Sequence, residues 1–180
     1  MTGRVASLSL SGRHEFSKQL AQSLELIAGE GVAGDAHCGR TVKHRSLVAI
    51  DPSQPNLRQV HLIAAELLDE LNAGGFALNS GDIGENVLTR GIDLIDLPRG
   101  TRLRIGSEAE IELTGLRNPC GQIEAFRPGL LARVALRSGD GSILRRSGVM
   151  AIVLHGGRIV LHDPITVELP PLPHQPLDRV

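Results

Sequence analysis

Short segments in which polar and apolar residues alternate are the feature that most restricts how this chain can fold. Arg4–Leu10 and Glu110–Thr114 both alternate with a period of two residues, which is typical of a β-strand that buries one face. Turns that contain glycine and proline separate such segments, as at Leu97–Gly100 and Asp163-Pro164. The pattern favours many short strands over long helices.

Further strands are predicted where short apolar runs lie between turns, at Arg58–Ile63, Asn86–Thr89, Thr101–Ile105, Val149–Leu154, Ile159–Leu161 and Ile165–Leu169. Val149–Leu154 is apolar throughout, which predicts burial on both faces. Gly156-Gly157 follows it and predicts a hairpin that returns through Ile159–Leu161. Ala64–Leu71 has helical spacing, because its leucines fall on one face.

These elements together predict a mainly β protein, a closed or partly open β-barrel with a few short helices. A chain of 180 residues fits one domain, which we expect over residues 1–169. Four of the seven residues 170–176 are proline. Residues 170–180 are therefore expected to form an extended, poorly packed tail.

The charge and composition of the chain argue against several classes of partner. A formal net charge of -1 is unlike that of a nucleic-acid-binding or polybasic membrane-binding protein, and the lack of Trp and Tyr removes the usual stacking platforms. The first residues lack the apolar core of a signal peptide, and no apolar run is long enough to span a membrane. Two cysteines cannot build a disulfide framework. We therefore expect a cytoplasmic protein that binds neither nucleic acid nor membrane.

Cys120 lies at the end of a strand-like segment, in the run Thr114–Gly121. A thiol placed at a strand end beside Pro119 and Gly121 can face a pocket, and the charge of Arg117 would favour its thiolate. A thiolate in such a pocket can bind a metal or carry sulfur. The alternative is that Cys120 is a small buried apolar residue without chemistry.

Two glycine-rich segments carry further candidate residues. Gly31–Gly39 includes Gly34, Asp35 and His37, which could bind an anion or donate a proton; the alternative is a surface loop capped by Asp35. Gly81–Asn86 includes Asp82, Glu85 and Asn86, whose side chains could contact a heterocycle, or else form a pair of turns. Arg58 could hold a phosphate, although an ordinary salt bridge would look the same in the sequence.

Five blocks in this order resemble the MOSC domain, the C-terminal domain of molybdenum-cofactor sulfurase. The resemblance extends from about Arg4 to Val167, and the blocks are Gly-x-x-Gly-Asp-x-His (31–37), Arg-Gln-Val-x-Leu-Ile (58–63), Gly-Asp-x-Gly-Glu-Asn (81–86) with Thr-Arg-Gly-Ile-Asp-Leu (89–94), Gly-Thr-Arg-Leu-Arg-Ile-Gly (100–106) and Thr-Gly-x-Arg-x-Pro-Cys (114–120).

The resemblance implies a barrel of the pyruvate-kinase-insert type that binds the molybdenum cofactor and reduces N-hydroxylated compounds. It makes Cys120 the metal ligand and a catalytic residue, because thiolate is a soft donor suited to molybdenum. In that setting, the chemistry of histidine and the position of His37 in a glycine-rich loop make it a candidate second catalytic residue that moves protons. The residues expected to bind the cofactor are Gly34, Asp35, Arg58, Asp82, Glu85, Asn86, Thr114 and Arg117.

Electrons are expected from a separate electron-donor protein, because the sequence has neither a cysteine cluster for iron–sulfur binding nor a strand followed by GxGxxG. Two other functions stay open. Cys120 could be a sulfur carrier that accepts persulfide sulfur, with Arg117 stabilising its charge, or the domain could hold the cofactor without turnover. Cys38 departs from the family pattern, where the residue after the histidine is not generally cysteine.

Overall fold

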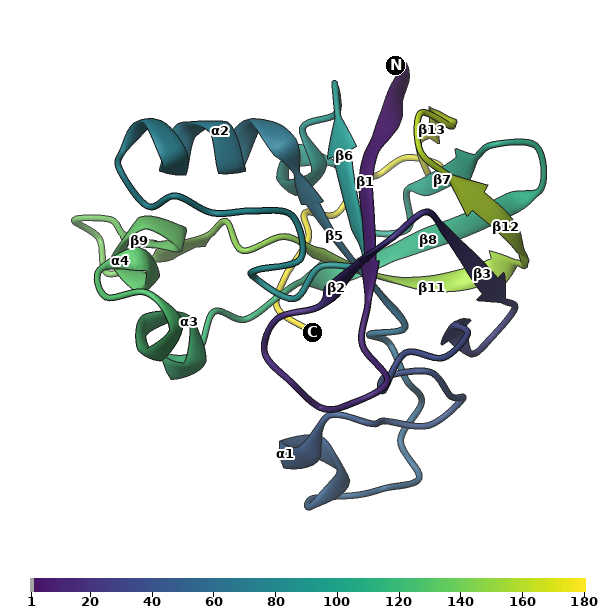
Figure 1. Ribbon diagram of the computed structural model, residues 1–180, viewed down its shortest axis with the longest axis horizontal. Helices are drawn as coiled ribbons and strands as arrows, with labels where there is room; N and C mark the ends of the chain where they lie inside the picture. Colours follow the sequence, from purple (N-terminus) through teal and green to yellow (C-terminus); the bar gives the residue numbers. More distant parts are fainter. Residues whose placement is uncertain (1) are drawn as a thin grey trace.

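Seven strands close into a β-barrel in the order β13, β7, β8, β11, β5, β6 and β1, with β1 pairing to β13 at the closing seam (Figure 1). The computed structural model describes residues 2–180, apart from the side chain of Arg45. The barrel strands are β1 (Thr2–Leu10), β5 (Val60–Ala64), β6 (Val87–Arg90), β7 (Arg102–Ile105), β8 (Ala109–Leu116), β11 (Val149–His155) and β13 (Pro164–Glu168). The predicted mainly β barrel is therefore confirmed.

The other elements are short and lie outside the barrel. β2 (Gln19–Ala21) extends the sheet beside β1, and a small sheet is formed by β3 (Ser23–Ile27), β4 (Gly31–Val32) and β12 (Gly157–Val160). A hairpin is formed by β9 (Ala135–Arg137) and β10 (Ile143–Arg145). The helices are α1 (Arg45–Val48), α2 (Ala65–Ala73), α3 (Gly121–Phe126) and α4 (Leu130–Val134), with a 3-10 turn at Leu94–Asp96.

Aliphatic side chains fill two neighbouring cores. The larger one is the barrel interior, where Val5, Leu62 and Leu103 are almost fully buried. The smaller one lies outside the barrel wall under α2, α3 and α4, and includes Ile63 and Ile123. Since successive residues of a strand point to opposite faces, β5 contributes Leu62 to one core and Ile63 to the other.

The predicted helix is confirmed as α2, and its three leucines are buried against β5 and β6. The helix ends at Ala73, where Gly74 caps it and Gly75 adopts a positive φ of 90°. No described helix has the length and apolar character needed to cross a bilayer.

The predicted hairpin between β11 and β12 is wrong. Gly157 pairs with Leu26 and Ile159 with Leu24, so β12 joins β3 in the small sheet. One edge of β11 is paired with β8 as far as His155. On the other edge β5 pairs with Val149–Ala151 and the N–H of Gly29 donates to the carbonyl of Val153, which leaves no edge for a returning strand. β11 is also not buried equally on its two faces, because Val149, Ala151 and Val153 are buried while the residues between them are partly exposed.

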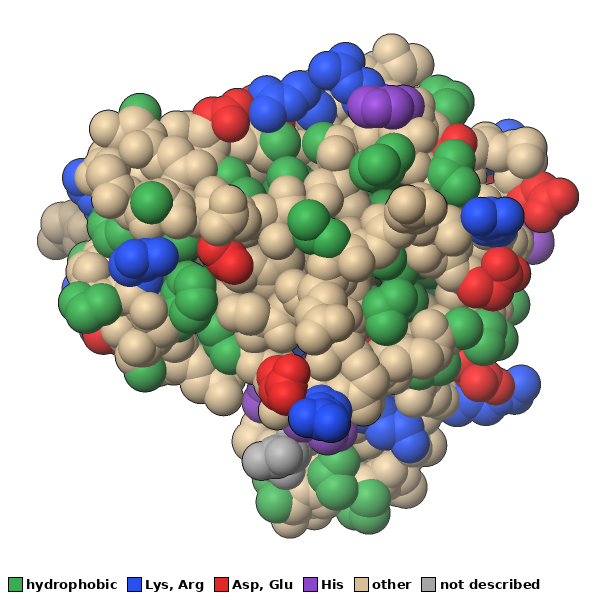
Figure 2. All heavy atoms as spheres, viewed as in Figure 1, with side chains coloured by type: hydrophobic (Ala, Val, Ile, Leu, Met, Phe, Trp, Pro, Cys, Tyr) green, Lys and Arg blue, Asp and Glu red, His purple; other side chains and the backbone are tan. Residues whose placement is uncertain are grey.

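The tail differs in part from its prediction. Its proline-rich part is exposed, with Leu172 81% exposed, but Leu177 is 8% exposed and belongs to the barrel core. The last residues therefore pack, although their sequence looks like a free tail. Figure 2 shows charged side chains of both signs dispersed over one face of the molecule, with histidines in the recess between the barrel and the part that carries α1.

Candidate functional site

A cavity of about 550 Å³ contains Cys120 and brings together side chains from segments far apart in the sequence. Five predicted site residues line it: His37, Arg58, Asn86, Arg117 and Cys120. Two other hollows, of about 300 and 460 Å³, lie along α2 and contain none of the predicted site residues. Five of the ten sequence-based candidates thus converge on one cavity.

Cys120 stands between the end of β8 and the start of α3, with extended backbone (φ −131°, ψ 172°). Its side chain is partly exposed, and Sγ lies 3.6 Å from Oε1 of Gln122. Because Cys120 lines the cavity and is partly exposed, its sulfur is not sealed among the aliphatic side chains of either core.

Two arginines give the cavity positive charge. Arg117 is partly buried, donates a hydrogen bond to the carbonyl of Ile83 and lies 5.6 Å from the centre of the Phe16 ring. Burial lowers the pKa of Arg117, and the charge of Cys120 acts in the opposite direction, so the two groups are close enough to interact. Burial also lowers the pKa of Arg58. Within the described chain, Nε of Arg58 is buried and has no hydrogen-bond partner.

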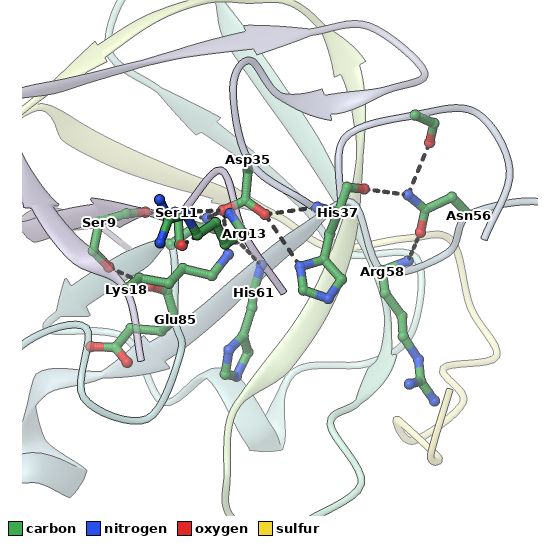
Figure 3. A network of polar contacts seen from close by, with 12 residues as sticks. Ser9, Ser11, Arg13, Lys18, Asp35, His37, Asn56, Arg58, His61 and Glu85 are labelled. Carbon is green, nitrogen blue, oxygen red and sulfur yellow. Dashed lines mark hydrogen bonds and ion pairs between the residues drawn. The ribbon is translucent and has the colours of Figure 1, made fainter. Parts of the chain in front are cut away.

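Asp35 lies behind the cavity wall and organises it. Its carboxylate accepts hydrogen bonds from the backbone N–H of His37 at 3.0 Å and from Nδ2 of Asn86 at 2.9 Å, and lies 3.3 Å from Nδ1 of His37. It also forms an ion pair with Lys18, and both side chains are almost fully buried. Figure 3 shows Asp35 at the centre of these contacts, with the ring of His37 beside its carboxylate, while the ring of His61 and the guanidinium of Arg58 extend away from it.

The charge state of Asp35 follows from these contacts. Burial alone would raise the pKa of Asp35, but the hydrogen bond from His37 and the charge of Lys18 outweigh it, and the pKa falls well below its usual range. Burial lowers the pKa of Lys18, and Asp35 opposes that shift. Asp35 is therefore an ionised residue that holds His37, Asn86 and Lys18 in place.

His61 is a cavity residue that sequence reasoning missed. It lies on β5 between Val60 and Leu62, its ring faces the carbonyl of Ser147 through Nε2 at 2.9 Å, and its own N–H donates to Oδ1 of Asn86. Burial and the charge of Arg117 lower the pKa of His61 well below its ordinary value. The alternation of β5 was a usable signal, since it places His61 opposite two core residues.

Lys18, His14 and His44 also line the cavity and were not predicted. They come from irregular segments whose spacing carries no information about what they face. Four of the seven histidines of the chain therefore meet at one place. Among the described residues, no group of three or more His, Cys, Asp or Glu side chains is arranged to hold a metal ion, so a metal here would have to bring other ligands with it.

The structure does not bring Gly34, Asp82, Glu85 or Thr114 into the described cavity lining. Gly34 lies in an exposed turn with φ 79°, and Asp82 accepts a hydrogen bond from the backbone of Asn79. Glu85 is buried, which raises its pKa, and Thr114 donates to a backbone carbonyl. A direct contact of these four residues with a cofactor stays a prediction.

Cys38 does not line this cavity, and burial raises the pKa of its thiol. It is partly buried and its backbone N–H donates to the carbonyl of Asp35 at 3.0 Å. The structure therefore gives the two cysteines different surroundings, which makes Cys38 a suitable control for Cys120.

Several solved structures have the same fold as this chain. The chain is similar to the YuaD protein from Bacillus subtilis, with a TM-score of 0.77 and 24% identity over 95% of this chain and 98% of that one. It is also similar to YiiM from Geobacillus stearothermophilus, with a TM-score of 0.66 and 14% identity over 97% of this chain and 79% of that one. YiiM from Escherichia coli gives a TM-score of 0.61 and 18% identity, over 96% and 73% of the two chains.

No curated protein matches the chain significantly. The model of the MOSC domain matches residues 41–166, a span that contains Arg58, Asn86, Arg117 and Cys120 but not the Gly31–Gly39 segment. Since this match covers more than half of the sequence, the chain belongs to the MOSC domain family.

Proposed function

We propose that this protein binds the molybdenum cofactor in the Cys120 cavity and uses it to reduce N-hydroxylated compounds. The observation that carries the proposal is the convergence of Cys120 with Arg58, Arg117 and His37 in one cavity. Membership of the MOSC family supports it.

The residues present fit such a cofactor. Cavities of roughly 300–1,000 Å³ hold small ligands and cofactors, and the volume here lies inside that range. The partly exposed Sγ of Cys120 is a soft donor of the kind molybdenum takes. The buried Nε of Arg58, which has no partner among the described residues, is a donor available to an anionic group.

In this proposal Cys120 would bind the metal through its thiolate, and Arg58 would hold the phosphate of the pterin. Asn86 would contribute cofactor contacts, while Asp35 would act indirectly through His37 and Asn86. The bound cofactor would supply two-electron chemistry at molybdenum. The chain itself supplies binding, orientation and charge.

His37 would deliver protons in the reduction. Converting an N–OH group to N–H takes two electrons and two protons and releases water, so the site needs a proton donor. His37 lines the cavity and its Nδ1 faces Asp35, which leaves Nε2 as the ring nitrogen that would deliver the proton. The two electrons would come from a separate electron-donor protein, since the chain has only two cysteines and thus no iron–sulfur centre of its own.

Metal analysis tests the proposal directly. Protein isolated from a host that makes the cofactor is expected to contain molybdenum, and the Cys120→Ser variant is expected to lose most of it, because a hydroxyl is a poor replacement for a soft thiolate ligand. Cys38→Ser is the matched control and should keep the metal. Equal molybdenum in both variants would sink the claim that Cys120 binds the metal.

Sulfur carriage is the second candidate, favoured by the partial exposure of Cys120 and its charge interaction with Arg117. A persulfide on Cys120 of metal-free protein, detected by mass, would support this function in place of reduction. Molybdenum-loaded protein that fails to reduce an N-hydroxylated base with a viologen donor would instead indicate a domain that holds the cofactor without turnover.

A further inference from the structure

The last four residues, Leu177–Val180, run along the end of β8 and complete the sheet there. β7 pairs only with residues 109–112 of β8, so the edge of β8 beyond Leu113 is open to another segment. The N–H of Leu116 donates to the carbonyl of Asp178 at 2.7 Å, and the N–H of Val180 donates to the carbonyl of Leu116 at 3.2 Å. Leu177 anchors the segment in the barrel core. Figure 1 shows this yellow segment crossing to the barrel end from which β8 continues toward α3.

Gly115 makes this close approach possible. A Cβ at this position would lie 2.5 Å from the carbonyl oxygen of Asp178 and 2.8 Å from Cβ of Val180. Gly115 does not have a positive φ, so an alanine would suit its backbone and would conflict only with the neighbouring segment. The glycine therefore serves the contact with Leu177–Val180.

The same segment is linked to the cavity at two places. The guanidinium of Arg58 donates a hydrogen bond to a backbone oxygen of Val180, which fixes the direction of a side chain that lines the cavity. Leu116 directly precedes Arg117, and the loop from Arg117 leads to Cys120. At Leu116 the strand is thus held between β11 on one side and Leu177–Val180 on the other.

We infer that Leu177–Val180 is a positioning segment for the site: it holds the base of the Arg117–Cys120 loop and the guanidinium of Arg58. It does not contact the sulfur itself and acts through Leu116 and Arg58. The loop is also held by the N–H of Arg117, which donates to the carbonyl of Gly148, so releasing the segment removes one support among several and makes the thiol of Cys120 more accessible. The inference goes beyond the proposed function, because thiol accessibility can be read on metal-free protein.

The test uses the full chain in a Cys38→Ser background, so that Cys120 is the only thiol. Gly115→Ala displaces the segment from the β8 side, and Val180→Pro removes the N–H that bonds Leu116 from the other side. Hydrogen exchange of the peptides that contain residues 112–117 and 174–180 reports release. The rate of Cys120 alkylation by iodoacetamide reports the effect on the site.

In both variants exchange should accelerate and alkylation of Cys120 should rise about fivefold, the change that loss of a typical net hydrogen-bond contribution makes to a local opening equilibrium. Gly139→Ala is the matched control, because a Cβ there meets nothing within 4 Å. Ile159→Val is a second control, because it removes a buried methyl group in the small sheet and so lowers the overall stability at a site away from the segment. It should leave the alkylation rate of Cys120 unchanged.

Two results would overturn the inference. Release of the segment with an unchanged alkylation rate would mean that it contributes stability alone. Undisturbed exchange in both variants would mean that neither Gly115 nor the Val180 N–H holds the segment. Both results leave the molybdenum measurement on Cys120→Ser unaffected, so failure here is distinguishable from failure of the proposed function.

Discussion

The carboxylate of Asp35 contacts three side chains and accepts hydrogen bonds from two backbone N–H groups. Its own side chain is only 1% exposed. A buried charge costs free energy unless opposite charge and hydrogen bonds compensate it, and here both are present. The sequence suggested that Asp35 contacts a cofactor or caps a surface loop. Its contacts show that it supports His37 and Lys18, and a direct contact with a cofactor stays a prediction.

Asp35→Asn should therefore destabilise the protein by about 3–5 kcal/mol, because it leaves Lys18 buried without its counter-charge. Urea unfolding at pH 7 measures the change. The matched control is Asp51→Asn, an exposed carboxylate that bonds only to Ser53, for which a loss below about 1 kcal/mol is expected. Similar losses in the two variants would contradict the buried ion pair.

The difference in unfolding free energy between the wild type and Asp35→Asn should depend on pH, because folding lowers the pKa of Asp35. A carboxyl whose pKa is depressed by folding stabilises the folded state above its unfolded pKa, near 4, and this contribution is lost as the pH falls toward the folded pKa. The stability gap between wild type and Asp35→Asn should thus narrow as the pH is lowered from about 5 to about 2.5.

At the scale of elements, β5 connects the barrel, the helical layer and the cavity. It pairs parallel to β6 and antiparallel to β11, and β5–β6 is the one parallel pair among the barrel strands of the described chain. Val60 and Leu62 face the barrel core, Ile63 faces the α2 side, and His61 faces the cavity. A change in the protonation of His61 therefore acts on a central strand.

The pKa of His61 is lowered by burial, so the unfolded chain binds a proton below about pH 6.5 that the folded chain does not. Stability should consequently fall on acidification, by about 1 kcal/mol from this residue between pH 7 and 5.5. Between pH 7 and 5.5 the unfolding free energy of His61→Gln, measured with urea, should therefore fall by about 1 kcal/mol less than that of the wild type. The pKa of His44 is lowered as well, but His44 is present in both proteins, so its contribution cancels in the comparison.

The control for this comparison is Leu172→Ala in the exposed proline-rich part of the tail, which removes no titratable group and should keep the pH dependence of the wild type. A His61→Gln protein with an unaltered pH slope would show that His61 does not titrate differently in the folded and unfolded states.

At the scale of the whole molecule, closure of the barrel depends on the pairing of the first and last strands. Gly3 of β1 pairs with Ile165 of β13, and Ile165 pairs in turn with Ile105 of β7. β1 and β13 lie near opposite ends of the sequence, so most of the chain separates them. Closure removes the free edges that an open sheet would expose and encloses the aliphatic core.

Ile165→Ala should cost about 2–5 kcal/mol of unfolding free energy, because the side chain is fully buried at this seam and its loss leaves a cavity. The control is Leu144→Ala in β10, a side chain that is 49% exposed and lies outside the barrel, with an expected loss below about 1 kcal/mol. Denaturant unfolding followed by far-UV circular dichroism measures the unfolding free energy of both variants. Equal losses would mean that packing at the β1–β13 seam contributes little to stability.

Several features were predictable from the sequence because they depend on local patterns. Alternation predicted β1 and β8, and helical spacing of leucines predicted α2, since period and burial are linked directly. The helices α3 and α4 and the β9–β10 hairpin were missed, because they are short and carry weak local signals. The hairpin at Gly156-Gly157 was mispredicted because a turn signal does not report which sheet edges are free.

What the sequence by itself determined is the strand-rich fold and the candidate residues Cys120, Arg58, Arg117, His37 and Asn86, because residue type and local periodicity are enough for both. The tertiary structure alone decided which candidates share a cavity, that Asp35 stands behind its wall, that His61 joins it, and that the tail packs against β8. These facts depend on contacts between residues distant in the chain, and such contacts exist only after the barrel closes and brings its strand ends together.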